Sequence, residues 1–196
     1  IDKKYHKYFM PQSHLTIASF AGSLRKESIS RRLLRASMHL TSSNMSIMEL
    51  DIAEIPMFNA DLEIDGPPKV VSDLKKSVSA SDGLLIVTPE YNHGIPAVTK
   101  NVIDWLSRKN DNIGNVLSNL PVDIIAISGN SGNLVITQIR QVLVYPGAIP
   151  MPNGDVGLPG RQLEFNEAEQ LTESIFIDQI QKNLDQFTSW INKLSV

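Results

Sequence analysis

The hydrophobic pattern of the chain alternates between short apolar runs and stretches of helical period. Each apolar run is rich in β-branched and aliphatic residues and is followed by turn residues. The runs predict five strands, at residues 15–20, 46–50, 83–88, 122–127 and around 147–150. Strands that alternate with helices in this way are typical of a parallel sheet covered by helices on both faces.

About five helices are predicted between and after these strands. Their inward faces are marked by Ile29, Leu33, Ala36 and Leu40, by Val71, Leu74 and Val78, by Val98, Val102, Ile103 and Leu106, by the segment 134–145, and by Ile180, Leu184, Phe187 and Ile191. The third helix is predicted to begin near Ile95, with Pro96 in its first turn. The proline- and aspartate-bearing stretch from Ile55 to Pro68 predicts a long surface loop.

A single domain is predicted for residues 15–196, because 196 residues suit one well-buried core. Residues 1–14 mix charge, aromatic side chains and one proline without helical or strand period, which indicates a disordered N-terminal extension. This segment lacks the apolar core of a secretory signal, and no run is long enough for a membrane helix. We therefore expect a cytoplasmic protein.

Composition excludes several functional classes. The formal net charge of −3 gives no cationic field to hold a nucleic acid. The chain has no cysteine, which excludes disulfides, iron–sulfur clusters, thiolate zinc sites and a cysteine nucleophile. The four histidines are scattered, so no shared metal site is predicted. If the protein moves electrons, a bound cofactor has to carry them.

The loop after the first strand has the chemistry of a phosphate pocket. Gly22-Ser23-Leu24-Arg25-Lys26-Glu27-Ser28-Ile29-Ser30 offers hydroxyl groups, backbone N–H groups and a guanidinium at the start of a helix. The loop is neither a Walker A motif nor the three-glycine dinucleotide turn. Ser28 or Ser30 could instead serve only as a helix cap.

The loop after the most apolar strand is compact and suits a flat heteroaromatic ring. It reads Thr88-Pro89-Glu90-Tyr91-Asn92-His93-Gly94-Ile95-Pro96, and its backbone could meet the polar edge of such a ring. Pro89 and Gly94 could equally make a plain turn, with Glu90 a solvated carboxylate. Because open parallel sheets bind ligands at the carboxyl ends of their strands, these two loops should meet the loop after Ile127 there.

Together the two loops resemble the NADPH-dependent FMN reductase family. The matching residues are Gly22-Ser23-Leu24-Arg25-Lys26-x-Ser28 and Pro89-Glu90-Tyr91-Asn92-x-x-Ile95-Pro96-x-x-x-Lys100-Asn101-x-x-Asp104-Trp105. The resemblance implies a flavodoxin-like three-layer α/β/α sandwich with a five-stranded parallel sheet in the order 2-1-3-4-5. It also implies bound FMN, NADPH or NADH as the electron donor, and a homodimer or homotetramer.

The resemblance also implies roles for individual residues. Ser23, Arg25, Ser28 and Ser30 would hold the FMN phosphate, although Ser30 stands where the family more often has Asn. Pro89, Glu90, Tyr91, Asn92 and Ile95 would line the ring and the ribityl chain. The third loop, Ser128-Gly129-Asn130-Ser131-Gly132, would close over the ring, with Ser128 and Gly129 as contacts. Trp105 would pack near a subunit contact, and Asp104 would join its helix to a loop.

The predicted activity is an FMN-dependent NAD(P)H oxidoreductase that reduces a small acceptor, such as a quinone, an azo compound, a metal oxyanion or free flavin. No catalytic side chain is predicted, since hydride transfer through FMN needs alignment and exclusion of water rather than a titrating group. The alternatives are an FMN-binding redox sensor or electron shuttle, and a nucleotide-binding domain without flavin. No Gly-x-Ser-x-Gly elbow supports a hydrolase.

Overall fold

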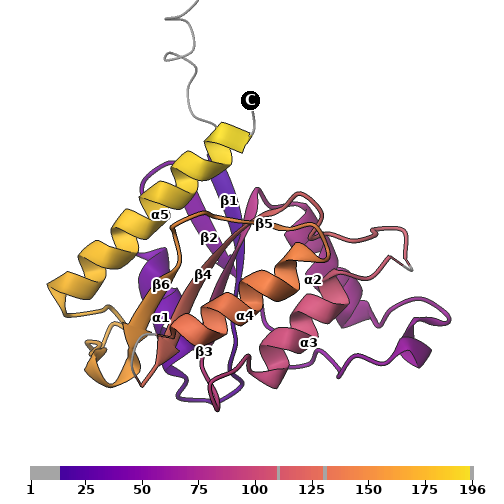
Figure 1. Ribbon diagram of the computed structural model, residues 1–196, viewed down its shortest axis with the longest axis horizontal. Coiled ribbons are helices and arrows are strands. Elements are labelled where there is room, and N and C mark those ends of the chain that lie inside the picture. Colours follow the sequence, from indigo (N-terminus) through magenta and orange to yellow (C-terminus); the bar gives the residue numbers. More distant parts are fainter. Residues whose placement is uncertain (1–13, 110, 130–131, 195–196) are drawn as a thin grey trace, which may run out of the picture.

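The computed structural model describes residues 14–109, 111–129 and 132–194, in which a parallel sheet lies between two layers of helices (Figure 1). The strands are β1 (Leu15–Ala21), β2 (Met45–Glu49), β3 (Gly83–Pro89), β4 (Pro121–Ser128), β5 (Ile149–Pro150) and β6 (Val156–Pro159). They run in the order β2-β1-β3-β4-β5, and β6 also pairs with β4. The predicted fold class and strand order are confirmed.

The helices divide between the two faces of the sheet. They are α1 (Ile29–Met38), α2 (Lys69–Ser79), α3 (Ala97–Leu106), α4 (Asn133–Val144) and α5 (Ser174–Leu194), with the short 3₁₀ helices η2 (Ala60–Glu63) and η3 (Gly160–Gln162). Figure 1 shows α1 and α5 on one side of the sheet and α2, α3 and α4 on the other. Among the described residues, none of the helices has both the length and the apolar character needed to cross a membrane.

The central strand β3 contributes to both hydrophobic cores. Leu85 and Val87 pack with α1 and α5, whereas Leu84 and Ile86 pack with α2, α3 and α4. All four side chains are fully buried, as expected for a parallel strand covered on both faces. The sheet thereby fixes the carboxyl ends of β1, β3 and β4 beside one another.

The edge beyond β4 differs from the prediction. The strand expected around 147–150 consists only of Ile149 and Pro150, and an unpredicted strand, β6, continues along β4 after an interruption. Pro150 and Pro152 lack the N–H groups that a ladder needs, and Asn153 is left-handed with φ of 57°. The edge therefore breaks into two short strands with a turn between them.

Two helix boundaries also differ. α1 ends at Met38, and α3 begins at Ala97, with Pro96 as its N-cap instead of in its first turn. The delay in α3 arises because Tyr91 and Gly94 exchange backbone hydrogen bonds and hold the preceding residues in a tight turn. Of the predicted extension, residues 1–13 lie outside the described residues, and His14 Nε2 lies 3.0 Å from Ser46 Oγ.

Candidate functional site

The loops after β1, β3 and β4 meet at one pocket, as the sequence predicts for the carboxyl edge of the sheet. Its volume is about 510 Å³, which is in the range of small-molecule sites. It is lined by Ser23, Arg25, Ser28, Ile29, Ser30, Pro89, Glu90, Tyr91, Ile127, Ser128, Gly129, Gly160 and Arg161.

The first turn of α1 forms one wall of this pocket. Ser28 is the N-cap, and its Oγ accepts the Arg31 N–H at 3.3 Å, so the capping role left open by the sequence is present. Ser28 Oγ also lies 2.8 Å from Ser30 Oγ, and both side chains are buried. The turn contains no acidic residue. A helix N-terminus with two hydroxyl groups and no carboxylate favours an anion.

Gly22 lets the first loop lie directly against α3. A Cβ at this position would overlap Thr99 Oγ1 and would lie 2.5 Å from Thr88 Oγ1. These two hydroxyl groups are hydrogen-bonded to each other at 3.0 Å, and Gly22 N–H donates to the Val87 carbonyl at 2.8 Å. Only glycine allows the loop to come this close to α3, and this close contact fixes the position of Ser23 at the pocket.

The second loop is held in place by hydrogen bonds from α4. Asn92 and His93 take left-handed backbone conformations, with φ of 50° and 59°. The side chain of Gln138 on α4 braces the loop, since its Oε1 accepts the Ile95 N–H at 3.2 Å and its Nε2 donates to the His93 carbonyl at 2.9 Å. The pocket therefore has a preformed wall at Tyr91.

Glu90 is not the solvated carboxylate that the sequence left open. Its side chain is only 10% exposed, and Oε2 accepts the Val135 N–H at 3.2 Å, in the first turn of α4. Oε1 lies 3.3 Å from His93 Nδ1. A carboxylate at a helix N-terminus is stabilised by the helix dipole. Glu90 thus ties the second loop to α4 while it lines the pocket.

The third loop is shaped by Ser128 and Gly132. Ser128 Oγ accepts the Gly132 N–H at 2.7 Å, and Gly132 is left-handed with φ of 66°. Gly129 is exposed and lines the pocket. Asn130 and Ser131, which the sequence placed in this loop, lie outside the described residues.

Two predicted ligand residues do not line the pocket, and four lining residues were not among those predicted: Ile29, Ile127, Gly160 and Arg161. Asn92 is exposed outside the lining, and Ile95 packs against the core between the sheet and α3. Gly160 and Arg161 come from η3, directly after the unpredicted strand β6. The Pro159-Gly160 pair was the sequence signal of a turn there, but nothing local placed that turn at the pocket.

The remaining motif residues support the site from outside. Trp105 is fully buried, and its Nε1 donates to the Pro56 carbonyl at 2.8 Å, which confirms a packing role. The carboxylate of Asp104 pairs with Lys100 on its own helix at 2.6 Å, and within the described residues it makes no bond to the loop at Pro56 and Phe58. Asn101 makes that connection instead, because it accepts the Phe58 N–H at 2.7 Å.

A second, apolar cavity adjoins the pocket. Its volume is about 420 Å³, and it is lined by Ser23, Leu24, Arg25, Tyr91, Pro96, Ala97 and Val98. Ser23, Arg25 and Tyr91 belong to both cavities. Tyr91 Oη lies 3.2 Å from Ser23 Oγ, so this contact forms part of the shared wall.

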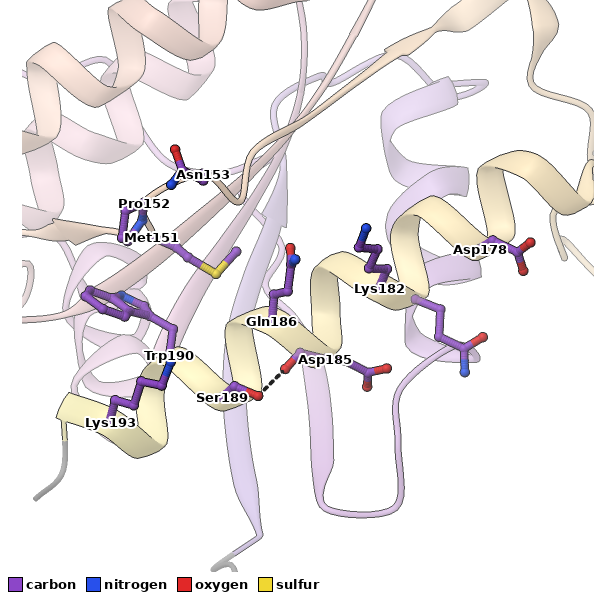
Figure 2. Close-up of a pocket in the computed structure, with 11 residues that line it drawn as sticks. Met151, Pro152, Asn153, Asp178, Lys182, Asp185, Gln186, Ser189, Trp190 and Lys193 are labelled. Atoms are coloured by element: carbon purple, nitrogen blue, oxygen red, sulfur yellow. Dashed lines mark hydrogen bonds between the residues drawn. The ribbon is translucent and has the colours of Figure 1, made fainter.

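A larger groove of about 680 Å³ lies elsewhere, between the turn at Met151–Asn153 and α5 (Figure 2). Figure 2 shows Met151 and the indole of Trp190 at one end, with Lys182 and Asp178 farther along α5. Met151 N–H donates to the Val122 carbonyl, near the start of β4. The Met151 end of the groove is therefore at the opposite end of β4 from the three loops, away from the edge where such sheets bind ligands.

Comparisons with known proteins agree with this geometry. Residues 15–162 match the family described as NADPH-dependent FMN reductase. A quinone reductase of Pseudomonas putida is 31% identical over 90% of this chain and 94% of its own length. An NAD(P)H-dependent FMN reductase of Pseudomonas aeruginosa is 30% identical over 92% and 97%. The structure of a flavoenzyme NAD(P)H:(acceptor) oxidoreductase from Paracoccus denitrificans superimposes with a TM-score of 0.82, at 28% identity, over 91% of this chain and 98% of that one.

Proposed function

This chain belongs to the NADPH-dependent FMN reductase family and is an FMN-dependent NAD(P)H oxidoreductase, and we propose that it reduces a quinone. The observation that carries the proposal is the apolar cavity beside the pocket where the three loops meet. We further propose that residues 15–196 act as one FMN-binding domain.

The residues of the pocket fit FMN. The first turn of α1, with its two buried hydroxyl groups and no acid, suits the phosphate, and Arg25 supplies a positive charge on the same wall. Gly22 lets the loop pack against Thr88 and Thr99, directly before the lining residue Ser23. In our proposal Ser23, Arg25, Ser28 and Ser30 hold the phosphate, while Pro89, Glu90, Tyr91, Ser128 and Gly129 line the rest.

FMN, when bound, accepts a hydride from the nicotinamide and returns two electrons to an acceptor. The residues of the chain orient the reactants. The second loop is fixed by Gln138 and Glu90, so that its backbone has little freedom to move. Such preorganisation supplies alignment, which is the main requirement of a direct hydride transfer.

The acceptor class follows from the second cavity. Leu24, Pro96, Ala97 and Val98 give it an apolar wall, and Tyr91 adds an aromatic ring that is 46% exposed. A planar apolar quinone is suited to such a surface, whereas a hydrophilic oxyanion would lose hydration against the apolar wall and would have to compete with the phosphate for Ser23 and Arg25. The names of the relatives support the same class.

The first experiment tests the redox function itself. The purified protein should be yellow, release FMN on denaturation, lose its colour with NADPH under anaerobic conditions, and regain it when 1,4-naphthoquinone is added. Loss of colour with dithionite but not with NADPH or NADH would favour the redox sensor or electron shuttle instead. A colourless protein that does not bind added FMN would refute every flavin-dependent function.

A variant tests the acceptor site. Leu24→Asp places a charge in the apolar cavity on a side chain that is already 47% exposed, so the fold should tolerate it. We expect the KM for 1,4-naphthoquinone to rise about tenfold or more, which corresponds to about 1.4 kcal/mol, with an unchanged rate for ferricyanide. Ile175→Asp, at an exposed apolar residue of α5, is the matched control. An unchanged KM in Leu24→Asp would refute this placement of the quinone.

The oligomer that the family resemblance implies also remains a proposal. Leu134, Val144 and Tyr145 of α4 and its C-cap are 52%, 67% and 96% exposed in the single chain, and α4 braces the second loop through Gln138. Burial of Leu134 between two copies would place part of the subunit contact near the second loop, and burial of Val144 and Tyr145 would extend it to the other end of α4. Light scattering after size-exclusion chromatography should give a multiple of 21.7 kDa, and Tyr145→Glu should lower it.

A further inference from the structure

Two arginines line the FMN pocket, and only Arg25 belongs to the motifs that carry the family resemblance. The second, Arg161, lies in η3 and is exposed. It forms no ion pair with any residue that the structure describes. A guanidinium at the edge of an anion-binding pocket, with no partner of its own in the described chain, is available for a ligand.

The segment around Arg161 runs from the end of β4 to the start of α1. Gly160 packs against β4, since a Cβ on it would lie 2.6 Å from Ile127 Cγ2. Five residues farther along, the ring of Phe165 lies 4.4 Å from the guanidinium carbon of Arg32, in the first turn of α1. Between these two points, Leu163 is buried in the core that α1 shares with α5. The segment that carries Arg161 is thus held between β4 and the first turn of α1, and Arg161 lines the same pocket as Arg25.

The charge of the phosphate calls for more than one cation. A phosphate monoester carries about −1.5 to −2 at pH 7, whereas Arg25 supplies a single positive charge. The first turn of α1 contains no acid that could compete for a guanidinium. The one carboxylate among the lining residues, Glu90, is already engaged by the Val135 N–H.

From this arrangement we propose that Arg161 binds the FMN phosphate together with Arg25 and the N-terminus of α1. The inference rests on the proposed FMN site and assigns to it a further binding residue that lies outside both sequence motifs. Arg161 is then a binding residue for the cofactor and takes no part in electron transfer. Because η3 follows β6, the pairing of β6 with β4 would position Arg161 at the phosphate site.

A comparison of FMN with riboflavin tests the proposal, because riboflavin has the same ring and ribityl chain without the phosphate. The full chain, freed of flavin by dialysis, is titrated with each flavin while flavin fluorescence is followed. We expect Arg161→Ala to weaken FMN binding by about 10- to 100-fold and to change riboflavin binding by less than about twofold. Arg161→Gln, which keeps most of the side-chain length, should behave in the same way.

The matched control is Lys26→Ala. Lys26 is an exposed cation of the first loop that does not line the pocket, so its removal should change FMN affinity by less than about twofold. Far-UV circular dichroism checks that each variant is folded, and Arg161→Gln replaces Arg161→Ala if the latter is not.

Equal weakening of FMN and riboflavin would overturn the proposal, because it would place Arg161 at the ring. Unchanged FMN affinity in both Arg161 variants would overturn it too, although the proposed function would stand. If the unmodified protein binds neither flavin, the proposed function fails and this inference fails with it.

Discussion

The buried carboxyl group of Asp123 should make the protein less stable as the pH rises. Asp123 lies within β4, is fully buried, and accepts a hydrogen bond from Asn183 Nδ2 of α5. Burial, together with the negative charge of Asp155, raises the pKa of Asp123 from 3.8 to about 7. The contribution of the protonated Asp123 to the unfolding free energy is fully present below pH 3.8 and is lost as the pH rises to about 7.

The size of the effect follows from the two pKa values. A tenfold change in proton affinity is worth about 1.36 kcal/mol, so the full loss of unfolding free energy is on the order of 4 kcal/mol. Roughly 2.6 kcal/mol of it falls between pH 5 and pH 8. Asp123→Asn cannot ionise, and its carbonyl can still accept from Asn183. The second carboxylate oxygen of Asp123, which the amide would replace, is buried and has no hydrogen-bond partner among the described residues.

Urea unfolding followed by far-UV circular dichroism measures this effect at pH 5, 6, 7 and 8. One saturating FMN concentration is kept throughout, because a ligand that binds the folded state raises its stability. The unfolding free energy of Asp123→Asn, relative to the unmodified protein, should rise by roughly 2.6 kcal/mol from pH 5 to pH 8. Asp178→Asn, at an exposed carboxylate of α5, should show no such rise. A constant difference for Asp123→Asn would refute the reasoning.

Three further substitutions test one contact of α2 and two contacts that support the site. Trp105→Phe keeps a buried ring but removes the indole donor to the Pro56 carbonyl, which also accepts from Asn101 Nδ2 at 2.9 Å. It should lower the unfolding free energy in urea by about 1 kcal/mol, and no loss would mean that the bond from Asn101 is sufficient. Lys75→Met removes a fully buried cation that lies 2.5 Å from Asp111 and should lower the unfolding free energy by about 3 kcal/mol. The double variant with Asp111→Asn should recover part of this loss, and an equal loss in the single and double variants would contradict the pairing. Gly22→Ala should lower both the melting temperature and the affinity for FMN, because the new methyl group would overlap Thr88 and Thr99. A melting temperature equal to that of the unmodified protein would show that α3 can move to make room for it.

The central part of the fold was predictable because local pattern and burial coincide there. The apolar run that became β3 contains residues 84–87, which are buried on both faces, and its composition alone indicates a central strand. The part of the pocket formed by the loop after β1 was predictable for a similar reason. The hydroxyl groups and Arg25 lie within one loop and the helix turn that follows it, so sequence distance and spatial distance agree.

The rest of the site depends on contacts between distant segments. Arg161 reaches the pocket because Pro159 pairs with Ser128, and a strand of four residues with Gly157 inside it has no recognisable period. Glu90 is a brace instead of a solvated group because Val135, 45 residues farther along, presents its N–H. Nothing near Glu90 or Arg161 in the sequence specifies these partners.

The second motif combines residues that line the pocket with residues that hold the lining in place. Pro89, Glu90 and Tyr91 line the pocket, whereas Asn101 and Trp105 bind the loop at Pro56 and Phe58 from the same helix. Since hydride transfer needs alignment more than it needs an acid or a base, residues that fix the loops contribute to function without contact with the reactants. A substitution such as Trp105→Phe should therefore affect stability first and turnover only as far as the second loop is displaced, which comparison of its unfolding free energy with its kcat can measure.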